Sequence, residues 1–242
     1  KEKMYYREKG SKRTWEKLSS ADKNASYIWI HAASLGEFEQ GRPIIEAIKE
    51  KNSQCKILLT FFSSSGYEVR RKYPLADIVC YLPIDTPRNA KRFVNSIQIE
   101  KAIFIKYEFW KNLLSQLHKR GIPTYLVSSI FRENQLFFKP YGQPHRKVLT
   151  LFSHIFVQNE SSKQLLQKIN INNVTVAGDT RCDRVTKIAQ NAKQIPLIKS
   201  FSEDADVLVA GSTWERDEKI ILRHFNQNPK LKLIVAPHEM SN

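Results

Sequence analysis

Runs of apolar residues alternate along most of the chain with segments in which apolar positions recur every three or four residues. The continuous runs predict buried β-strands, and the periodic segments predict amphipathic helices. Strands are expected at residues 27–33, 55–61, 77–82, 101–107, 123–129, 154–158 and 174–177. Helices are expected at about 37–51, 65–73, 87–97, 109–120, 140–151 and 160–169. Apolar strands separated by helices predict an α/β fold with a parallel sheet that is covered on both faces.

The pattern changes after Gly178. Residues 180–205 are polar, and a new strand–helix–strand unit follows, with strands expected at 206–210 and 232–236. One such unit cannot bury both faces of a sheet, so we expect a second domain of which this chain holds only the start. We therefore place the first domain at 1–193 and the second at 194–242.

The charge of the chain points to an anionic partner. The 242 residues include 39 Lys and Arg and 24 Asp and Glu, which gives a net charge of +15. Seven bases lie in the first twenty residues, and residues 86–147 hold twelve bases against three acids. Solvated helix faces explain any single lysine. The excess as a whole implies nucleic acid, an acidic membrane or a phosphorylated substrate.

Several functional classes lose support from the sequence. The three cysteines are scattered, without the spacing of a disulfide framework or a zinc site. No segment is long and apolar enough to span a bilayer. The chain opens with Lys1 rather than Met, so we expect a segment to have been removed upstream. Glycine-rich nucleotide motifs, a Gly-x-Ser-x-Gly motif and paired metal-binding histidines are all missing from the sequence.

The most informative candidate chemistry follows the strand expected at 27–33. The residues from Ser34 to Glu37 predict a tight turn at Gly36 that leads into a helix. The unpaired N–H groups and partial positive charge of a helix N-terminus favour an ionised carboxylate. Because α/β proteins bind ligands at this edge of the sheet, Glu37 is our candidate general base. An ordinary helix-capping carboxylate is the alternative.

Three further polar loops follow predicted strands. Residues 63–66 form a hydroxyl-rich helix entry, suited to an anion or a sugar. Glu108 ends an apolar strand beside two aromatic residues, and residues 128–132 end in an arginine. The ends of parallel strands open on one edge, so Glu37 and Glu108 are expected to share a cleft.

Each of these loops also has a structural interpretation. Glu108 would then pair with Lys106 or Lys111, and the serine run would be an ordinary N-cap. Each loop is a weak signal alone, and together on one edge they favour a site.

Six motifs in a fixed order carry a family resemblance. They are residues 29–37, 81–85, 108–112, 158–160, 178–183 and 211–214. In this order they resemble the 3-deoxy-D-manno-octulosonic acid (Kdo) transferases, over residues from about 9 to 242. That family transfers Kdo from CMP-Kdo to a lipid A precursor. The resemblance implies a GT-B architecture, with an N-terminal Rossmann-like domain for the acceptor and a C-terminal one for the nucleotide sugar.

The resemblance also implies residue roles. Glu37 matches the general base of the family, Glu108 matches a second functional acid, and Arg181 matches a cation that is usually Lys; the last two are expected to stabilise the transition state. Pro237 and His238 match the start of the CMP-binding segment, where many relatives carry Arg in place of His238. The other candidate substrate-binding residues lie in the strand-end loops and are Ser34, Gly36, Ser65, Gly66, Arg132, Ser212 and Thr213.

The resemblance implies an inverting, single-displacement reaction without a cofactor or metal. Its partners would be the CMP-Kdo donor, the lipid A precursor acceptor and an anionic inner-membrane surface, with no nucleic acid. Family members usually begin with a hydrophobic anchor, so we expect the chain at the cytoplasmic face of the inner membrane. Basic side chains near such a surface contribute about 1 kcal/mol each.

Two alternatives remain open at this point. One is a basic Rossmann-like module that binds nucleic acid or anionic lipid without catalysis; aromatic residues interleaved with bases are typical of such proteins. Residues 131–141 show that interleaving in four aromatic residues, which we interpret instead as an apolar face for acyl chains or membrane: Phe131, Phe137, Phe138 and Tyr141. The other alternative is a different GT-B sugar-nucleotide enzyme.

Overall fold

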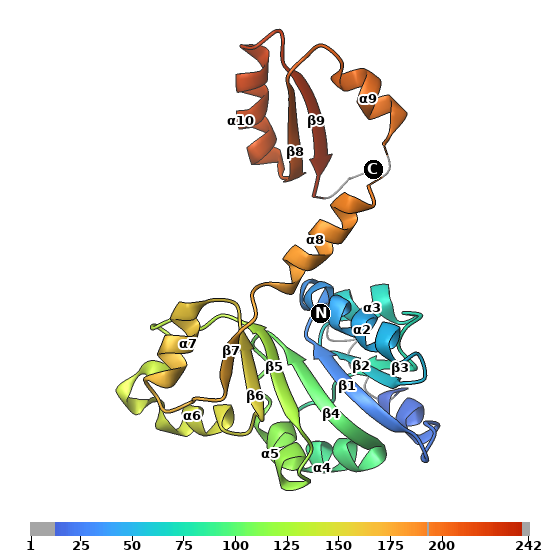
Figure 1. The fold of residues 1–242 in the computed structure, drawn as a ribbon, viewed down its shortest axis with the longest axis vertical. Helices are drawn as coiled ribbons and strands as arrows, with labels where there is room; N and C mark the ends of the chain where they lie inside the picture. Colours follow the sequence, from blue (N-terminus) through green and yellow to red (C-terminus); the bar gives the residue numbers. More distant parts are fainter. Residues whose placement is uncertain (1–12, 193, 239–242) are drawn as a thin grey trace. The chain divides into compact units, whose positions relative to one another are not determined.

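The computed structural model describes residues 13–192 and 194–238 and shows two compact units (Figure 1). Contacts group Lys1–Lys187 in the first unit and Ile188–Asn242 in the second. The domain boundary predicted between residues 193 and 194 falls at residue 193, which lies outside the described residues.

The first unit is built around a seven-stranded sheet with the order β3-β2-β1-β4-β5-β6-β7 (Figure 1). All neighbouring strands in it pair in parallel. The strands are β1 (Ser26–Ala32), β2 (Lys56–Phe61), β3 (Ile78–Tyr81), β4 (Gln98–Ile105), β5 (Thr124–Ser129), β6 (His154–Val157) and β7 (Val174–Val176). The predicted parallel sheet is confirmed, and each strand lies within a few residues of its expected position.

Helices cover the two faces of this sheet. They are α2 (Leu35–Lys51), α3 (Ser64–Arg70), α4 (Pro87–Ser96), α5 (Lys111–Lys119), α6 (Gln143–Leu149) and α7 (Glu160–Gln167). The single helix predicted at 140–151 is instead a 3₁₀ turn, η2 (Pro140–Gly142), followed by α6, and a second 3₁₀ turn, η1 (Leu136–Phe138), precedes it. Residues 13–19 form a helix that the sequence analysis did not predict.

The core consists of two apolar layers, one on each face of the sheet, because successive side chains of a strand point to opposite faces. Ile30 of β1 belongs to the layer that includes Phe38 and Ile45 of α2. Trp29 belongs to the opposite layer, which includes side chains from α4 to α7. Its ring lies 5.0 Å from that of Phe104 on β4, centroid to centroid. Both faces of β1 and β4 are therefore buried. This packing holds in place the carboxyl ends of the two strands, from which the loops with Glu37 and Glu108 start.

The second unit contains a parallel pair of strands, β8 (Val207–Thr213) and β9 (Lys232–Pro237), with helices α9 (Pro196–Ser202) and α10 (Glu215–Asn226). Helix α8 (Thr180–Gln190) precedes α9. The sequence analysis described 180–205 only as polar and missed both helices. Apolar residues do recur at helical spacing in α8, at Cys182, Val185 and Ala189, but polar residues outnumber them along the helix.

Among the described residues, the helices are all too short or too polar to span a bilayer.

Candidate functional site

The strand order of the first unit reverses between β1 and β4, which lie side by side (Figure 1). In open parallel sheets, such a switch point leaves a crevice outside the carboxyl ends of the two strands, where ligands bind. Glu37 follows β1 and Glu108 follows β4. The structure thus brings the two predicted acids to one edge of the sheet, and to the two strands that flank the switch point.

Glu37 lies in the first turn of α2, where Ser34 is the N-cap residue with extended backbone. The predicted glycine turn is wrong, because α2 begins at Leu35 and Gly36 already lies inside its first turn. Ser and Glu three positions apart form the pattern of a capping box. Here, however, the Ser34 hydroxyl donates to the Glu37 carboxylate, and it makes no capping bond to the backbone. The carboxylate is therefore held by its neighbour at the mouth of the sheet.

Lys106 supplies the positive charge beside Glu37. Its Nζ lies 3.6 Å from Glu37 Oε1. Partial burial raises the pKa of Glu37, but the Ser34 hydroxyl, the backbone N–H and Lys106 together leave this pKa below its ordinary value. Lys106 adopts a φ of 69°, a left-handed conformation that is strained for a residue other than glycine and that often marks functional positions. Lys106 was predicted from the sequence as a possible partner of Glu108, and the structure pairs it with Glu37 instead.

Glu108 is instead bound by two aromatic ring nitrogens. Trp110 Nε1 donates to Glu108 Oε2 over 2.6 Å, and His31 Nε2 lies 3.1 Å from the same oxygen. His31 is fully buried in β1, and Glu108 is 9% exposed. The sequence analysis missed His31 as a site residue, although a histidine within an otherwise apolar strand was a signal for it.

Asp85 fixes the start of α5 and thereby the loop that carries Glu108. Its carboxylate accepts hydrogen bonds from the backbone N–H groups of Asn112 and Leu113, both at 2.9 Å. Such bonds satisfy N–H groups that have no partner within the helix. The motif at residues 81–85 therefore has a physical role in this fold.

The predicted serine loop lies against the same edge. A Cβ atom on Gly66 would stand 2.3 Å from a ring carbon of Phe61 and 3.0 Å from the carbonyl carbon of Ser34. Only glycine permits this close approach of α3 to the loop before α2. Ser65 Oγ lies 2.7 Å from Ser63 Oγ, so the two hydroxyls share a hydrogen bond at the start of α3.

Arg181 reaches this region through Asp179. Its Nη2 and Nε lie 2.6 and 3.0 Å from Asp179 Oδ2, and this pairing contributes to a pKa of about 2 for Asp179. Asp179 Oδ1 accepts from Gln40, which lies one turn beyond Glu37 on α2. Arg132 is exposed, and its backbone N–H donates to Gln135.

The remaining predicted residues form a separate cluster in the second unit. Ser212 Oγ lies 2.9 Å from His238 Nδ1, and the backbone N–H of His238 donates to Thr213 at 2.9 Å. Pro237 ends β9 immediately before His238. The His238 ring lies 4.7 Å from that of Trp214, centroid to centroid. The ends of β8 and β9 are thus joined by local contacts.

Within residues 13–192 and 194–238, the structure shows no group of three or more His, Cys, Asp or Glu side chains that could hold a metal ion.

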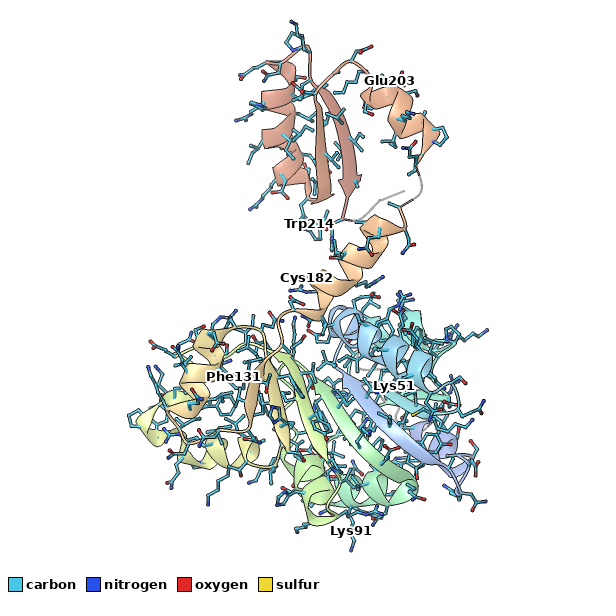
Figure 2. All side chains as sticks on the ribbon, in the orientation of Figure 1. Lys51, Lys91, Phe131, Cys182, Glu203 and Trp214 are labelled. Atoms are coloured by element: carbon cyan, nitrogen blue, oxygen red, sulfur yellow. The ribbon has the colours of Figure 1, made fainter. Side chains whose placement is uncertain are left out.

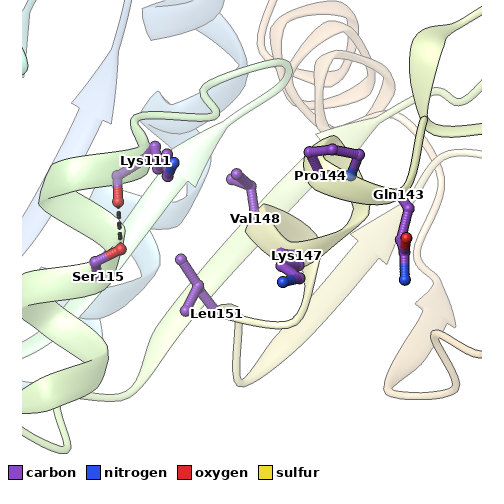
Figure 3. Close-up of a pocket in the computed structure, with 7 residues that line it drawn as sticks. All are labelled: Lys111, Ser115, Gln143, Pro144, Lys147, Val148 and Leu151. Atoms are coloured by element: carbon purple, nitrogen blue, oxygen red, sulfur yellow. Dashed lines mark hydrogen bonds between the residues drawn. The ribbon is translucent and has the colours of Figure 1, made fainter. Parts of the chain in front are cut away.

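A pocket of about 400 Å³ lies between α5 and α6 (Figure 3). Lys111, three residues after Glu108, and Lys147 line it together with Ser115, Val148 and Leu151. It combines two cationic side chains with apolar ones.

The aromatic segment after β5 is mostly internal. Phe131, labelled in Figure 2, is 2% exposed, and Phe137 packs against it at a ring distance of 6.0 Å. Phe138 is also half-buried in this cluster. The interpretation of these phenylalanines as an exposed apolar face is therefore wrong for Phe131 and weak for the other two, while Tyr141 is 70% exposed.

Solved structures of low sequence identity share the fold. UDP-GlcNAc 2-epimerase from Neisseria meningitidis, bound to UDP-GlcNAc, aligns with a TM-score of 0.61 at 16% identity, over 86% of this chain and 64% of that one. The corresponding epimerase from Methanocaldococcus jannaschii aligns with a TM-score of 0.59 at 15% identity, over 88% and 73%. The predicted α/β fold of GT-B type is confirmed.

Sequence comparison gives a narrower result. The 3-deoxy-D-manno-octulosonic acid transferase of Haemophilus influenzae is 29% identical over 226 residues, which are 87% of this chain and 51% of the relative. The enzyme of that name from Aquifex aeolicus is 28% identical over 221 residues, 89% of this chain and 55% of the relative. The chain spans about half the length of these curated relatives.

The family model described as 3-deoxy-D-manno-octulosonic-acid transferase (kdotransferase) matches residues 7–184. This range contains the whole sheet of the first unit and the acids at its switch point. The chain therefore belongs to the 3-deoxy-D-manno-octulosonic-acid transferase (kdotransferase) family.

Proposed function

We propose that the protein is an inverting glycosyltransferase that transfers Kdo from CMP-Kdo to a lipid A precursor in lipopolysaccharide synthesis. Membership of the family supports the reaction class. The observation that carries the proposal is the Glu37 carboxylate, which lies at the switch point between the Ser34 hydroxyl and the Lys106 ammonium group.

In the proposed step, Glu37 takes the proton from an acceptor sugar hydroxyl while that oxygen attacks the anomeric carbon of Kdo. The bond from this carbon to the CMP phosphate breaks, CMP leaves with the electron pair, and the configuration inverts. A lowered pKa keeps Glu37 ionised at neutral pH, as a base must be. Glu108 and Arg181 assist the transition state, and neither a metal nor a cofactor takes part.

The acceptor side of the proposal uses the first unit. Ser34, Gly36, Ser65, Gly66 and Arg132 would contact the acceptor. The pocket between α5 and α6 would receive part of a phosphorylated, acylated molecule, because its lysines suit an anion and its apolar residues suit an acyl chain. Exposed Tyr141 and Leu136 lie in the segment that leads to α6.

This arrangement supports binding at the cytoplasmic face of the inner membrane, where basic side chains meet anionic lipid. The donor CMP-Kdo would be held by Ser212, Thr213, Pro237 and His238 in the second unit. The alternative of a nucleic-acid-binding module is not favoured, because the transferase family model matches residues 7–184. Phe131, one of the aromatic residues that suggested stacking on bases, is also buried.

A transfer assay on the full-length protein, with CMP-Kdo and a tetra-acylated lipid A precursor, tests the proposal. Glu37→Gln keeps the shape of the side chain but removes the base, and should lower kcat by about 10²- to 10⁴-fold. Glu46→Gln, on the same helix, is the matched control, because it removes a carboxylate that pairs with Arg42 and lies away from the Ser34 and Lys106 contacts of Glu37. Turnover by Glu37→Gln close to that of the native protein would exclude Glu37 as the base. A folded native protein that forms no product would refute the transferase assignment.

A further inference from the structure

His31 is a buried histidine to which neither the family match nor the proposed reaction gives a role. It is 0% exposed, and its ring packs edge-on against the rings of Phe104 and Trp110, at 5.8 and 6.0 Å. Its two nitrogens face different polar groups: Nδ1 lies 2.9 Å from Thr60 Oγ1, and Nε2 lies 3.1 Å from Glu108 Oε2. In the described part of the chain, Glu108 is the ionisable side chain that contacts this imidazole.

The donors and acceptors of these groups favour one arrangement of the protons. An ionised carboxylate only accepts hydrogen bonds, so Nε2 must carry a hydrogen where it meets Glu108. An indole N–H only donates, and Trp29 Nε1 lies 2.8 Å from Thr60 Oγ1, so the Thr60 oxygen accepts from Trp29. The Thr60 hydroxyl then has one proton to donate, and Nδ1 of a neutral imidazole can accept it at 2.9 Å. The backbone oxygen of Thr60 lies farther from Nδ1, at 3.2 Å, and would accept a hydrogen from Nδ1 in the other tautomer.

These bonds form a directed chain from the core to the sheet edge. If His31 is neutral with its hydrogen on Nε2, Trp29 donates to Thr60, Thr60 donates to His31, and His31 donates to Glu108. Trp110 donates to the same carboxylate oxygen from the other side, at 2.6 Å. Oε2 of Glu108 therefore contacts the buried His31 ring and the partly buried Trp110 ring, while Oε1 takes part in neither bond. Buried hydrogen-bond chains of this kind define a single geometry, since breaking one link leaves an unpaired polar group.

We propose that Thr60 and His31 are positioning residues: the Thr60 hydroxyl holds neutral His31 in the Nε2–H tautomer, and His31 thereby fixes the orientation of the ionised Glu108 carboxylate at the switch point. The catalytic consequence rests on the proposed function, in which Glu108 assists the transition state. The tautomer itself does not depend on that function.

Two measurements on the full-length protein test the tautomer of His31 and its catalytic consequence separately. The first is the long-range ¹H–¹⁵N spectrum of protein labelled at histidine, with the His31 signal assigned by its loss in His31→Gln. We expect the Nε2–H pattern in the native protein and in Thr60→Ser, which keeps the hydroxyl. Thr60→Val removes the hydroxyl and leaves the backbone oxygen of residue 60, 3.2 Å from Nδ1, as the remaining acceptor. His31 should therefore change to the Nδ1–H tautomer or take up a second proton.

The second measurement is the rate of Kdo transfer. Thr60→Val should lower kcat by about 10- to 100-fold with little change in KM for either substrate, because a displaced catalytic group loses rate rather than binding. Thr60→Ser should restore the native rate. Trp110→Phe should also lower kcat, but without a change in the tautomer of His31.

Each outcome tests one of three claims: the tautomer of His31, the role of Thr60 in setting it, and its effect on catalysis. An Nδ1–H tautomer in the native protein would overturn the proposal, and this spectrum needs no variant to fold. A native-like tautomer in folded Thr60→Val would overturn the role of Thr60. Native kcat in a Thr60→Val protein with a changed tautomer would refute the link to catalysis. Absence of transfer by the native protein would refute the proposed function alone and leave the tautomer result intact.

Discussion

Both units place a residue with a left-handed backbone conformation near a cluster of polar side chains. They differ in how far apart in the sequence the contacting side chains lie and in how deeply these are buried. Lys106 after β4 and Ser212 within β8 both adopt left-handed φ angles, of 69° and 59°. In the first unit, Glu108 bonds to His31, which is 77 residues away in the sequence. In the second unit, Ser212 contacts His238, 26 residues away, and both are exposed.

The difference shows what a complete sheet adds to a strand-end motif. All residues of β1 after the first are buried, whereas only Ala210 and Thr213 are buried in β8. Strain of the backbone can be set locally, but a fixed site needs neighbouring strands and helices on both faces to supply partners and exclude water. In the part of the chain that the structure describes, that condition is met at the switch point of the first unit.

The largest effect should separate the two units in stability. Phe104 of β4 is fully buried against Trp29 and Phe152, so Phe104→Ala should cost about 3–5 kcal/mol of unfolding free energy. Ile220 of α10 is 69% exposed, and Ile220→Ala should change stability by less than about 0.5 kcal/mol. Urea unfolding of variants of this 242-residue chain measures both. Equal losses would break the comparison, since they would mean that Ile220 is as well packed as Phe104.

Two glycines, one beside each cluster of candidate site residues, compare how tightly the two units are packed there. In Gly66→Ala the new methyl group would overlap the Phe61 ring, which should cost about 1–3 kcal/mol. Gly211 in β8 has no atom within 4 Å of a built Cβ, so Gly211→Ala should be tolerated. Thermal unfolding and transfer activity are the measurements. A tolerated Gly66→Ala would show that α3 can move away from the loop that carries Ser34.

The smallest effect on stability is expected for the pair formed by Asp179 and Arg181, which are close in the sequence, as are the contacts of the second unit. The pKa of Asp179 lies at about 2, below its ordinary value of 3.8, so its ionisation stabilises the fold above pH 3.8 and this contribution is lost as the pH falls toward 2. Arg181→Gln should move the pKa of Asp179 toward 3.8 and reduce the loss of stability in that pH window. Because the pair is exposed, its removal should cost no more than about 1 kcal/mol at neutral pH. A carboxyl NMR titration of Asp179 measures the shift, and an unchanged pKa would show that Arg181 is not its main partner.

The fold was predictable from local pattern wherever a segment buries an apolar face. The seven strands and most helices of the first unit follow from periodicity, because burial on both faces selects apolar runs. Helix α8 was missed because polar residues outnumber apolar ones along it, and the turn predicted at Gly36 was wrong because the helix starts at Leu35. The site was predictable as far as its acids, since Glu37 and Glu108 each follow an apolar strand.

By itself, the sequence determined the alternation of strands and helices, the two acids at strand ends, and the order of motifs that marks the family. The tertiary structure decided which groups meet. It places β1 beside β4, so that Lys106 pairs with Glu37 and His31 with Glu108, and it turns Phe131 inward. The physical reason is that a strand's own pattern encodes only whether its faces are buried. Hydrogen bonds between side chains depend on strand order and register, which arise from packing across the whole sheet.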